Sequence, residues 1–199
     1  MKNTIKTIKK SLLVVAVCTA ILGNANEIST LSTKENVFKE TELTLSNVKP
    51  GNLLSIKDYN GIVLYKELIK STGTYNKGFD LTALPKGEYY FEIDKDLEIK
   101  TIPFTVKSNT VEFKKEEEVI TFKPYVRQKN DLVLLSKLAP NLETLNVSIY
   151  AETIGGYELA YSEKIEGSQT IERAYKLEKG NYKLVFNSDN KQFTKFINN

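Results

Sequence analysis

The sequence predicts an all-β protein made of two tandem antiparallel β-sandwich modules that follow a cleaved signal peptide. Apolar residues alternate with a period of two through most of the chain, which is typical of strands with one buried face. Turn residues separate these short segments, and one stretch of roughly 80 residues occurs twice. With 41% hydrophobic and 27% charged residues, the composition is that of a globular protein.

The first 25 residues have the pattern of a secretory signal peptide. An apolar run at residues 12–22 is followed by Gly23-Asn24-Ala25, and we expect cleavage after Ala25. A helix of that run would span about 16 Å, roughly half the hydrocarbon core of a bilayer, so we expect no transmembrane segment in the mature chain. The predicted location is therefore outside the cytoplasm, in the periplasm, on the cell surface or in the medium. The basic residues before the run are Lys2, Lys6, Lys9 and Lys10.

The single cysteine, Cys18, lies within the apolar run. Its interpretation as a lipid-modified residue at the cleavage site is disfavoured, because Val17 stands where a small residue is expected and the apolar run continues beyond it. Cleavage after Ala25 removes Cys18, and the chain contains no histidine. Thiol and imidazole catalysis, disulfides and thiolate metal sites are therefore excluded from the mature protein.

The apparent basic charge of the chain belongs to its signal peptide. Removing the four lysines of that segment from the 28 basic residues leaves 24, against 25 acidic residues, so the mature chain has a formal net charge of −1. A near-neutral protein without a basic stripe is a poor candidate for binding nucleic acid. We expect no nucleic-acid partner.

An internal repeat organises the rest of the sequence. Residues Leu84–Ile93 recur as Leu177–Phe186, 93 positions later. Leu54-Ser55-Ile56 matches Val147-Ser148-Ile149 at the same offset, whereas Tyr65–Ile69 resembles Tyr161–Ile165 at an offset of 96. The difference of three residues falls in the preceding hairpin, where an insertion is tolerated.

The repeat predicts module one at residues 26–107 and module two at residues 119–199. Between them, residues 108–118 are expected to form a charged linker. Its segment Lys114–Glu118 carries both signs of charge and no apolar residue, so it has no face with which to pack.

The strands predicted in module one follow from the alternation and the turn residues. Asn60-Gly61 predicts a type I′ hairpin, and Ile154-Gly155-Gly156 is expected to form the equivalent hairpin turn of module two. Asp94-Lys95-Asp96 and Asn187–Asn190 mark a second hairpin. Pro103 places the last strand at a sheet edge or a bulge, because proline cannot donate to a ladder. The expected strands are residues 42–48, 53–58, 62–69, 79–81, 88–94 and 98–106, and module two repeats their order.

The repeated Leu-x-Lys-Gly-x-Tyr element predicts a structural corner at Gly87 and Tyr89, and again at Gly180 and Tyr182. Glycine permits a special backbone conformation there, and the tyrosine that opens the next strand turns inward. Its hydroxyl group is expected to bond the backbone at the corner. Tyr→Phe at either corner should then remove one hydrogen bond.

These motifs resemble the immunoglobulin-like and fibronectin-III-like β-sandwiches of bacterial secreted proteins. More narrowly, Asp58-x-Asn60-Gly61-x-Val63 followed by Phe79-Asp80-Leu81 and Gly87-x-Tyr89 is similar to the C-terminal sorting domain of the type IX secretion system. That resemblance implies export by the signal peptide and sorting across the outer membrane by the last domain. An internal copy of the module, and the absence of an opening Pro-Asn-Pro segment, are equally compatible with a plain tandem sandwich protein.

The residue types and motifs of the mature chain predict no catalytic, cofactor-binding or metal-binding residues. We therefore expect that the protein is not an enzyme. Carboxylates such as Glu88 and Glu92 are expected singly on the outward faces of strands, rather than paired as in a glycosidase. No glycine-rich loop before a helix is present to hold a phosphate, so no nucleotide cofactor is expected. Outward-facing Tyr90 and Tyr150 are either isolated surface aromatics or parts of a recognition surface.

The sequence thus predicts a noncatalytic structural or binding protein of the envelope or medium, with an unknown protein or glycan partner. The alternative is a type IX secretion cargo whose second module is the sorting domain.

Overall fold

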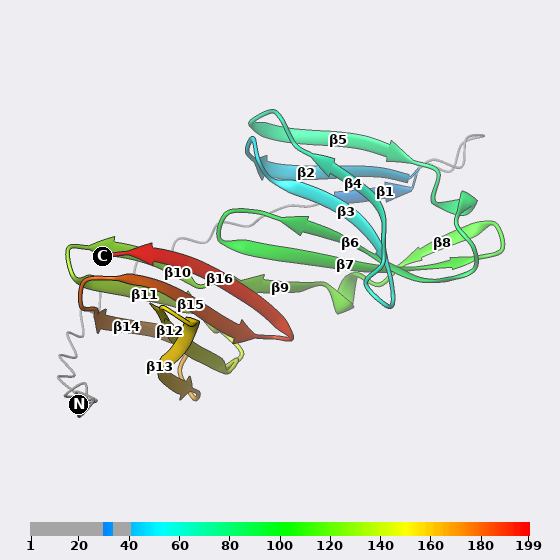
Figure 1. The fold of residues 1–199 in the computed structure, drawn as a ribbon. Coiled ribbons are helices and arrows are strands. Elements are labelled where there is room, and N and C mark those ends of the chain that lie inside the picture. The colour runs from blue at the N-terminus through cyan, green and yellow to red at the C-terminus, as the bar shows by residue number, and fades with distance from the viewer. Residues whose placement is uncertain (1–29, 34–40) are drawn as a thin grey trace, which may run out of the picture. The chain divides into compact units, whose positions relative to one another are not determined.

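The computed structural model describes residues 30–33 and 41–199 (Figure 1). The predicted signal peptide lies outside the described residues. The described chain is built from antiparallel strands with two short 3₁₀ turns, and it divides into two compact units at Lys123 and Pro124. The predicted all-β fold of two Ig-like sandwiches is confirmed. Within the described part of the chain, no helix is long and apolar enough to cross a membrane.

The first unit, which ends at Lys123, pairs a three-stranded sheet with a larger one. The small sheet has the order β1-β2-β5 and the large sheet the order β4-β3-β6-β7-β8, with β9 also pairing with β7. Their inner faces form one core that includes Leu43, Leu54, Phe91 and Phe104, each at most 1% exposed. The strands are β1 (Thr30–Thr33), β2 (Thr41–Val48), β3 (Leu53–Asp58), β4 (Val63–Leu68), β5 (Gly73–Phe79), β6 (Gly87–Asp94), β7 (Glu98–Lys107), β8 (Thr110–Phe113) and β9 (Val119–Phe122).

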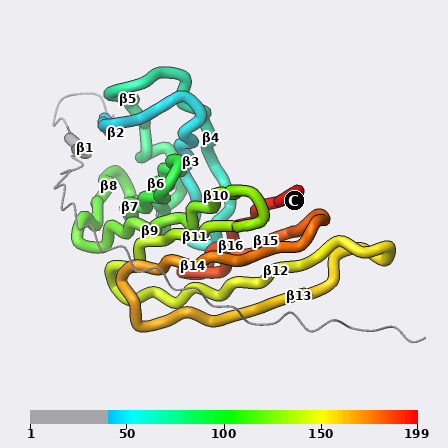
Figure 2. The backbone as a smooth tube through the Cα atoms, turned by 90° about the vertical axis from the view of Figure 1, so that its left-hand side faces the viewer, coloured from blue at the N-terminus to red at the C-terminus, as the bar shows by residue number. Residues whose placement is uncertain are grey.

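The second unit, Pro124–Asn199, has a three-stranded sheet of order β10-β11-β14 and a four-stranded sheet of order β13-β12-β15-β16. The four strands of the larger sheet run side by side in Figure 2. Its core includes Leu145, Leu184 and Phe186. The strands are β10 (Tyr125–Lys129), β11 (Leu132–Leu138), β12 (Leu145–Thr153), β13 (Gly156–Ile165), β14 (Thr170–Lys176), β15 (Asn181–Ser188) and β16 (Lys191–Asn198).

The two units share one topology. In each, the first, second and fifth strands form one sheet, and the fourth, third, sixth and seventh form the other. Because the fourth strand pairs with the third rather than with the fifth, this is the fibronectin-III-like form of the sandwich. Both units also carry a bulge in the fourth strand, where Leu64 and Ala160 have no partner in the ladder. The sequence repeat is therefore a repeat of structure.

The fifth strand of the first unit differs from its prediction. The structure has β5 at Gly73–Phe79, whereas Leu81 and its neighbours, expected in a strand at 79–81, form the 3₁₀ turn η1 (Leu81–Ala83). The segment Gly73–Phe79 contains two glycines and several polar residues, so it lacks the apolar alternation of a half-buried strand. Its backbone pairing with β2 forms the strand nevertheless.

The hairpin at Asn60-Gly61 also differs in its turn type. Gly61 has a φ of 83°, but Asn60 is not among the residues of positive φ. The Gly61 amide donates to the Asp58 carbonyl at 2.9 Å, and the Ile62 amide to the Asp58 carboxylate at 2.8 Å. This is a three-residue loop with glycine in the left-handed position, not a type I′ turn. Two successive positive φ values occur instead at Asp189 and Asn190, in the β15–β16 hairpin.

The segment predicted as a charged linker, residues 108–118, contains β8 and the 3₁₀ turn η2 (Lys115–Glu117), and the unit boundary lies after Lys123 instead. Both β8 and β9 pair with β7. Lys100 Nζ, in a buried side chain, lies 2.8 Å from the Glu118 carboxylate. The charges that suggested a solvated connection therefore help to fasten this segment to the sheet.

Pro103 lies in β7, between the part that pairs with β8 and the part that pairs with β9. Its carbonyl accepts from the Lys114 amide at 3.0 Å, on the side of β7 that faces β8 and β9, while β8 pairs from Phe104 onward and β9 pairs as far as Thr101. The nitrogen and carbonyl of one residue point to the same side of a strand, so the missing N–H falls in the gap between two covering strands. Proline is tolerated there because the ladder needs no donor.

Candidate functional site

The glycine and tyrosine corners occupy equivalent places at the start of β6 and β15. The Tyr89 hydroxyl donates to the Pro85 carbonyl at 2.8 Å, and a Cβ at Gly87 would lie 3.4 Å from the Tyr89 ring. In the second unit, Gly180 has a φ of 152°, and half-buried Tyr182 makes a hydrogen bond with the backbone of residue 178. Gly87 is not among the glycines of positive φ, so the special backbone conformation predicted there is absent. The four residues lie where the chain crosses from one sheet to the other.

We expect Tyr89→Phe to lower the free energy of unfolding of the first unit by roughly 0.5 to 1.5 kcal/mol, because it removes one hydrogen bond to a carbonyl. Tyr89→Ala should cost several times more, since it also leaves a cavity against Phe104, whose ring centroid lies 5.6 Å away. Urea unfolding measures both. The control is Tyr59→Phe, at a side chain 78% exposed, and an equal loss there would remove the assigned role.

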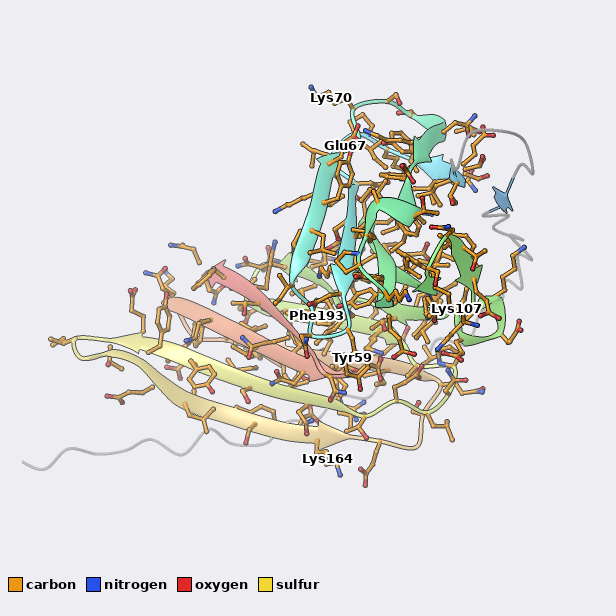
Figure 3. All side chains as sticks on the ribbon, turned by 90° about the vertical axis from the view of Figure 1, so that its right-hand side faces the viewer. Tyr59, Glu67, Lys70, Lys107, Lys164 and Phe193 are labelled. Atoms are coloured by element: carbon orange, nitrogen blue, oxygen red, sulfur yellow. The ribbon has the colours of Figure 1, made fainter. Side chains whose placement is uncertain are left out.

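Each unit contains a cluster that joins its two sheets at one edge, which we call the tyrosine–glutamate clamp. In the first unit, Tyr65 and Glu67 come from β4 and Tyr75 and Lys77 from β5. Tyr65 donates to the Glu67 carboxylate, which also pairs with Lys77, and Lys77 Nζ lies 2.6 Å from the Tyr65 hydroxyl. Figure 3 labels Glu67 at this edge. Strands that share no backbone ladder are thus connected by side chains.

The second unit repeats the clamp between β13 and β14. The Glu163 carboxylate accepts from the Tyr175 hydroxyl at 2.7 Å and from Arg173 Nε at 3.2 Å. The Tyr161 and Tyr175 rings are 5.9 Å apart. Sequence reasoning matched Tyr65-x-Glu67 with Tyr161-x-Glu163 but did not identify their partners. Because each carboxylate is held by a cation and a phenol, the clamp is structural.

The clamp predicts a loss of stability at alkaline pH. Burial, followed by the proximity of Glu67, raises the pKa of Tyr75 to about 12. Its hydroxyl is buried beside the Glu67 carboxylate. A pKa raised on folding contributes stability that is complete below the unfolded pKa of about 10 and is lost as the pH rises toward 12. Tyr75→Phe should therefore reduce the slope of unfolding free energy against pH between about 10 and 12, and an unchanged slope would contradict this role.

The outer face of the four-stranded sheet in the second unit carries a row of aromatic, aliphatic and basic side chains. Leu159, Tyr150, Lys183 and Phe196 lie directly opposite one another on β13, β12, β15 and β16. Leu159 is 58% exposed and Phe196 is 63% exposed. We call these four residues the open row. Sequence-predicted Tyr150 therefore belongs to a larger surface rather than standing alone.

Lys183 is held over aromatic rings in this row. Its Nζ lies 4.8 Å from the ring centroid of Tyr150 and 5.1 Å from that of Tyr157, which stands two residues from Leu159 on β13. The Tyr157 and Phe196 rings are 6.1 Å apart. No ion pair joins Lys183 to a carboxylate in the described part of the chain. Cation–π contacts of this kind position an ammonium group without neutralising it.

The first unit has an equivalent row of residues, which we call the closed row because its lysine is paired with a carboxylate of the chain. Val63, Lys57, Tyr90 and Pro103 occupy the equivalent positions, with lysine and tyrosine exchanged between the two central strands. Lys57 Nζ lies 2.6 Å from the carboxylate of Glu92, a residue only 9% exposed. Glu92 thus lies on the outer face, as the sequence suggested, but it is buried rather than solvated. Sequence-predicted Tyr90 is half-buried beside this ion pair.

Polar side chains flank the open row on both sides. On one side, the Asn181 amide donates to Glu152 at 2.6 Å, and the Asn198 amide donates to the Asn181 oxygen at 2.8 Å. On the other, Asn146, Asn187 and Gln192 lie opposite one another on β12, β15 and β16 and line a pocket of about 650 Å³. The remaining lining residues are Thr144, Ser188, Asp189, Asn190 and Lys191.

This arrangement offers groups that can bind a ligand. Among the residues that the structure describes, no group of three or more acidic or cysteine side chains could hold a metal ion. Exposed aromatic rings, an ammonium group and a series of amides offer stacking and hydrogen bonds to a ligand. The open row and its flanking amides are the candidate site.

Comparisons with known proteins identify no family. No protein-family model and no curated protein matches the chain. Among solved structures, it is similar to the FN1–FN3 domains of chicken CNTN1, with 8% identity, 86% of this chain and 67% of that chain covered, and a TM-score of 0.25. It is also similar to the BSP domain of a biofilm-associated protein, with 13% identity, 79% and 26% coverage, and a TM-score of 0.26.

Proposed function

We propose that the protein is an exported, noncatalytic binding protein of the cell envelope or medium, and that the open row of its second unit is the binding surface. The first unit then acts as a structural module that spaces or supports the second. The partner is a protein or glycan of the envelope.

The observation that carries this proposal is the contrast between two equivalent rows. A duplicated fold would present the same face twice, yet the first row is closed by Lys57–Glu92 while the second leaves Lys183 among exposed rings. Exposed aromatic and aliphatic side chains next to amides are costly to keep in water and are common in recognition surfaces. Divergence at this one face supports a binding role there.

Adsorption of the mature protein to envelopes isolated from its native host tests the proposal. The double substitution Leu159→Ser with Phe196→Ser should weaken adsorption on the order of tenfold or more, because both side chains lie in the proposed contact. The matched control is Val63→Ser, which stands at the position equivalent to Leu159 in the closed row. Equal adsorption of the double variant and the control would reject the proposal.

The proposal includes maturation by cleavage after Ala25. The intact mass of the protein from its native host should correspond to a chain that begins at Asn26. A species that retains residues 1–25, or one that begins at a lipid-modified Cys18, would contradict this.

The second candidate function is that of a type IX secretion cargo, favoured by the resemblance of the repeated module to the sorting domain of that system. Because the unit boundary lies after Lys123, the test is a reporter with a signal peptide fused to Pro124–Asn199 in a host with that system. Release of the reporter with loss of the unit would favour sorting. Retention in the periplasm with the unit attached would favour a binding role.

A further inference from the structure

We infer that the open row binds a glycan that carries carboxylate groups, with its acidic group on Lys183 and its hydroxyl groups on the amides of Asn146, Asn187 and Gln192. The inference rests on the proposed function and names the ligand class of the same surface.

In the closed row, the lysine ammonium group is paired with a carboxylate. There, Lys57 is neutralised by Glu92, which lies diagonally across β3 and β6. The mirrored diagonal position for Lys183, across β12 and β15, is occupied by Ser148, which pairs with Val185. The row that holds Glu92 in the first unit therefore has no carboxylate in the second. Glu152, on the other side of Lys183 along β12, accepts a hydrogen bond from Asn181 and makes no ion pair with Lys183 among the described residues. A ligand carboxylate would supply the charge that the chain itself supplies in the first unit.

The polar end of the same face indicates that the rest of the ligand carries hydroxyl groups. Asn146 lies four residues from Tyr150 along β12, a distance of about 13 Å at the usual rise of a strand. The pocket there is lined by amides, hydroxyls, one aspartate and one lysine, and by no apolar side chain. Paired amide donors and acceptors suit sugar hydroxyls.

An acidic peptide fits this face less well. Anchor side chains of a peptide need an apolar pocket, and the pocket beside the open row has none. The backbone groups of the two central strands, β12 and β15, are already paired on both sides, so a peptide strand could add only at the edge strands β13 and β16 and not beside Lys183. Stacking on Tyr157 and Phe196 combined with amide contacts is a sugar-binding arrangement instead.

Calorimetric titration of the mature protein tests the inference with three acid-bearing probes: oligogalacturonate, oligoalginate and sialyllactose. Matched probes are the carboxyl-reduced forms of the same sugars and an acidic peptide, poly-glutamate. At least one acidic sugar should bind, and its reduced form should bind about tenfold more weakly or worse. Lys183→Met should produce a similar loss for the acidic sugar, and Asn146→Ala with Asn187→Ala should weaken both forms. The control Lys57→Met, in the closed row, should leave binding unchanged.

Three outcomes would overturn the inference: no binding by any acidic sugar, equal binding of the reduced forms, or preferential binding of poly-glutamate. The proposed function is judged separately, by adsorption of the Leu159→Ser and Phe196→Ser double variant to envelopes. If that variant loses adsorption and no acidic sugar binds in the titration, the surface binds another ligand. If the variant adsorbs normally and no acidic sugar binds, both proposals are contradicted.

Discussion

Replacing Glu163 by alanine is expected to lower the free energy of unfolding of the second unit by about 2 to 4 kcal/mol. The substitution removes the acceptor of the Tyr175 hydroxyl and the partner of Arg173 at once. Tyr175 is 9% exposed, so its hydroxyl would be left without a partner in a place that water reaches poorly. The loss should be larger than for an ordinary surface ion pair, which contributes at most about 1 kcal/mol.

Urea unfolding of the full mature chain measures this effect, with Glu172→Ala as the control. Glu172 neighbours Arg173 on β14 but is exposed. If the clamp acts as a unit, adding Tyr175→Phe to Glu163→Ala should cost less than the sum of the two single changes. Equal losses for Glu163→Ala and Glu172→Ala, or full additivity in the double variant, would show that the clamp does not hold the sheets together.

The second large effect is expected from Ser148→Glu, which should close the open row. Ser148 lies on the outer face, diagonal to Lys183, so a glutamate there would reproduce the geometry of Lys57 and Glu92 in mirror image. The new carboxylate should pair with Lys183 and weaken adsorption to envelopes on the order of tenfold or more. Stability should change little, because the substitution is on a half-buried outer position.

The control for Ser148→Glu is Ser148→Gln, which has the same shape without the charge. Glutamine should weaken adsorption much less than glutamate does. Equal adsorption of wild type and Ser148→Glu would show that the ammonium of Lys183 has no part in binding.

The repeat, the corners and most strands followed from sequence because each depends on local pattern. Alternation gave the second, third, sixth and seventh strands of the first unit to within one residue, and the Gly-x-Tyr spacing indicated both corners. The fifth strand did not follow, since Gly73–Phe79 becomes a strand through backbone pairing with β2 rather than through side-chain pattern.

The open row could not be predicted because it depends on the register between strands. Leu159 and Tyr161 are two residues apart and in a regular strand would share a face. The bulge at Ala160 places Leu159 opposite Tyr150 on the outer face and Tyr161 opposite Ile149 on the core side. One unpaired residue thus sends one side chain to the candidate site and the other to the clamp, and no periodicity of the sequence marks that change.

The most direct test of the central claim is a map of backbone amide chemical shifts in the mature protein, recorded as soluble envelope fragments of the native host are added. We expect shift changes at Tyr150, Lys183 and Phe196 in the open row, and none at the equivalent residues Lys57 and Tyr90 of the closed row. Changes confined to the closed row, changes spread equally over both rows, or no change in either would contradict the claim that the second unit carries the binding surface.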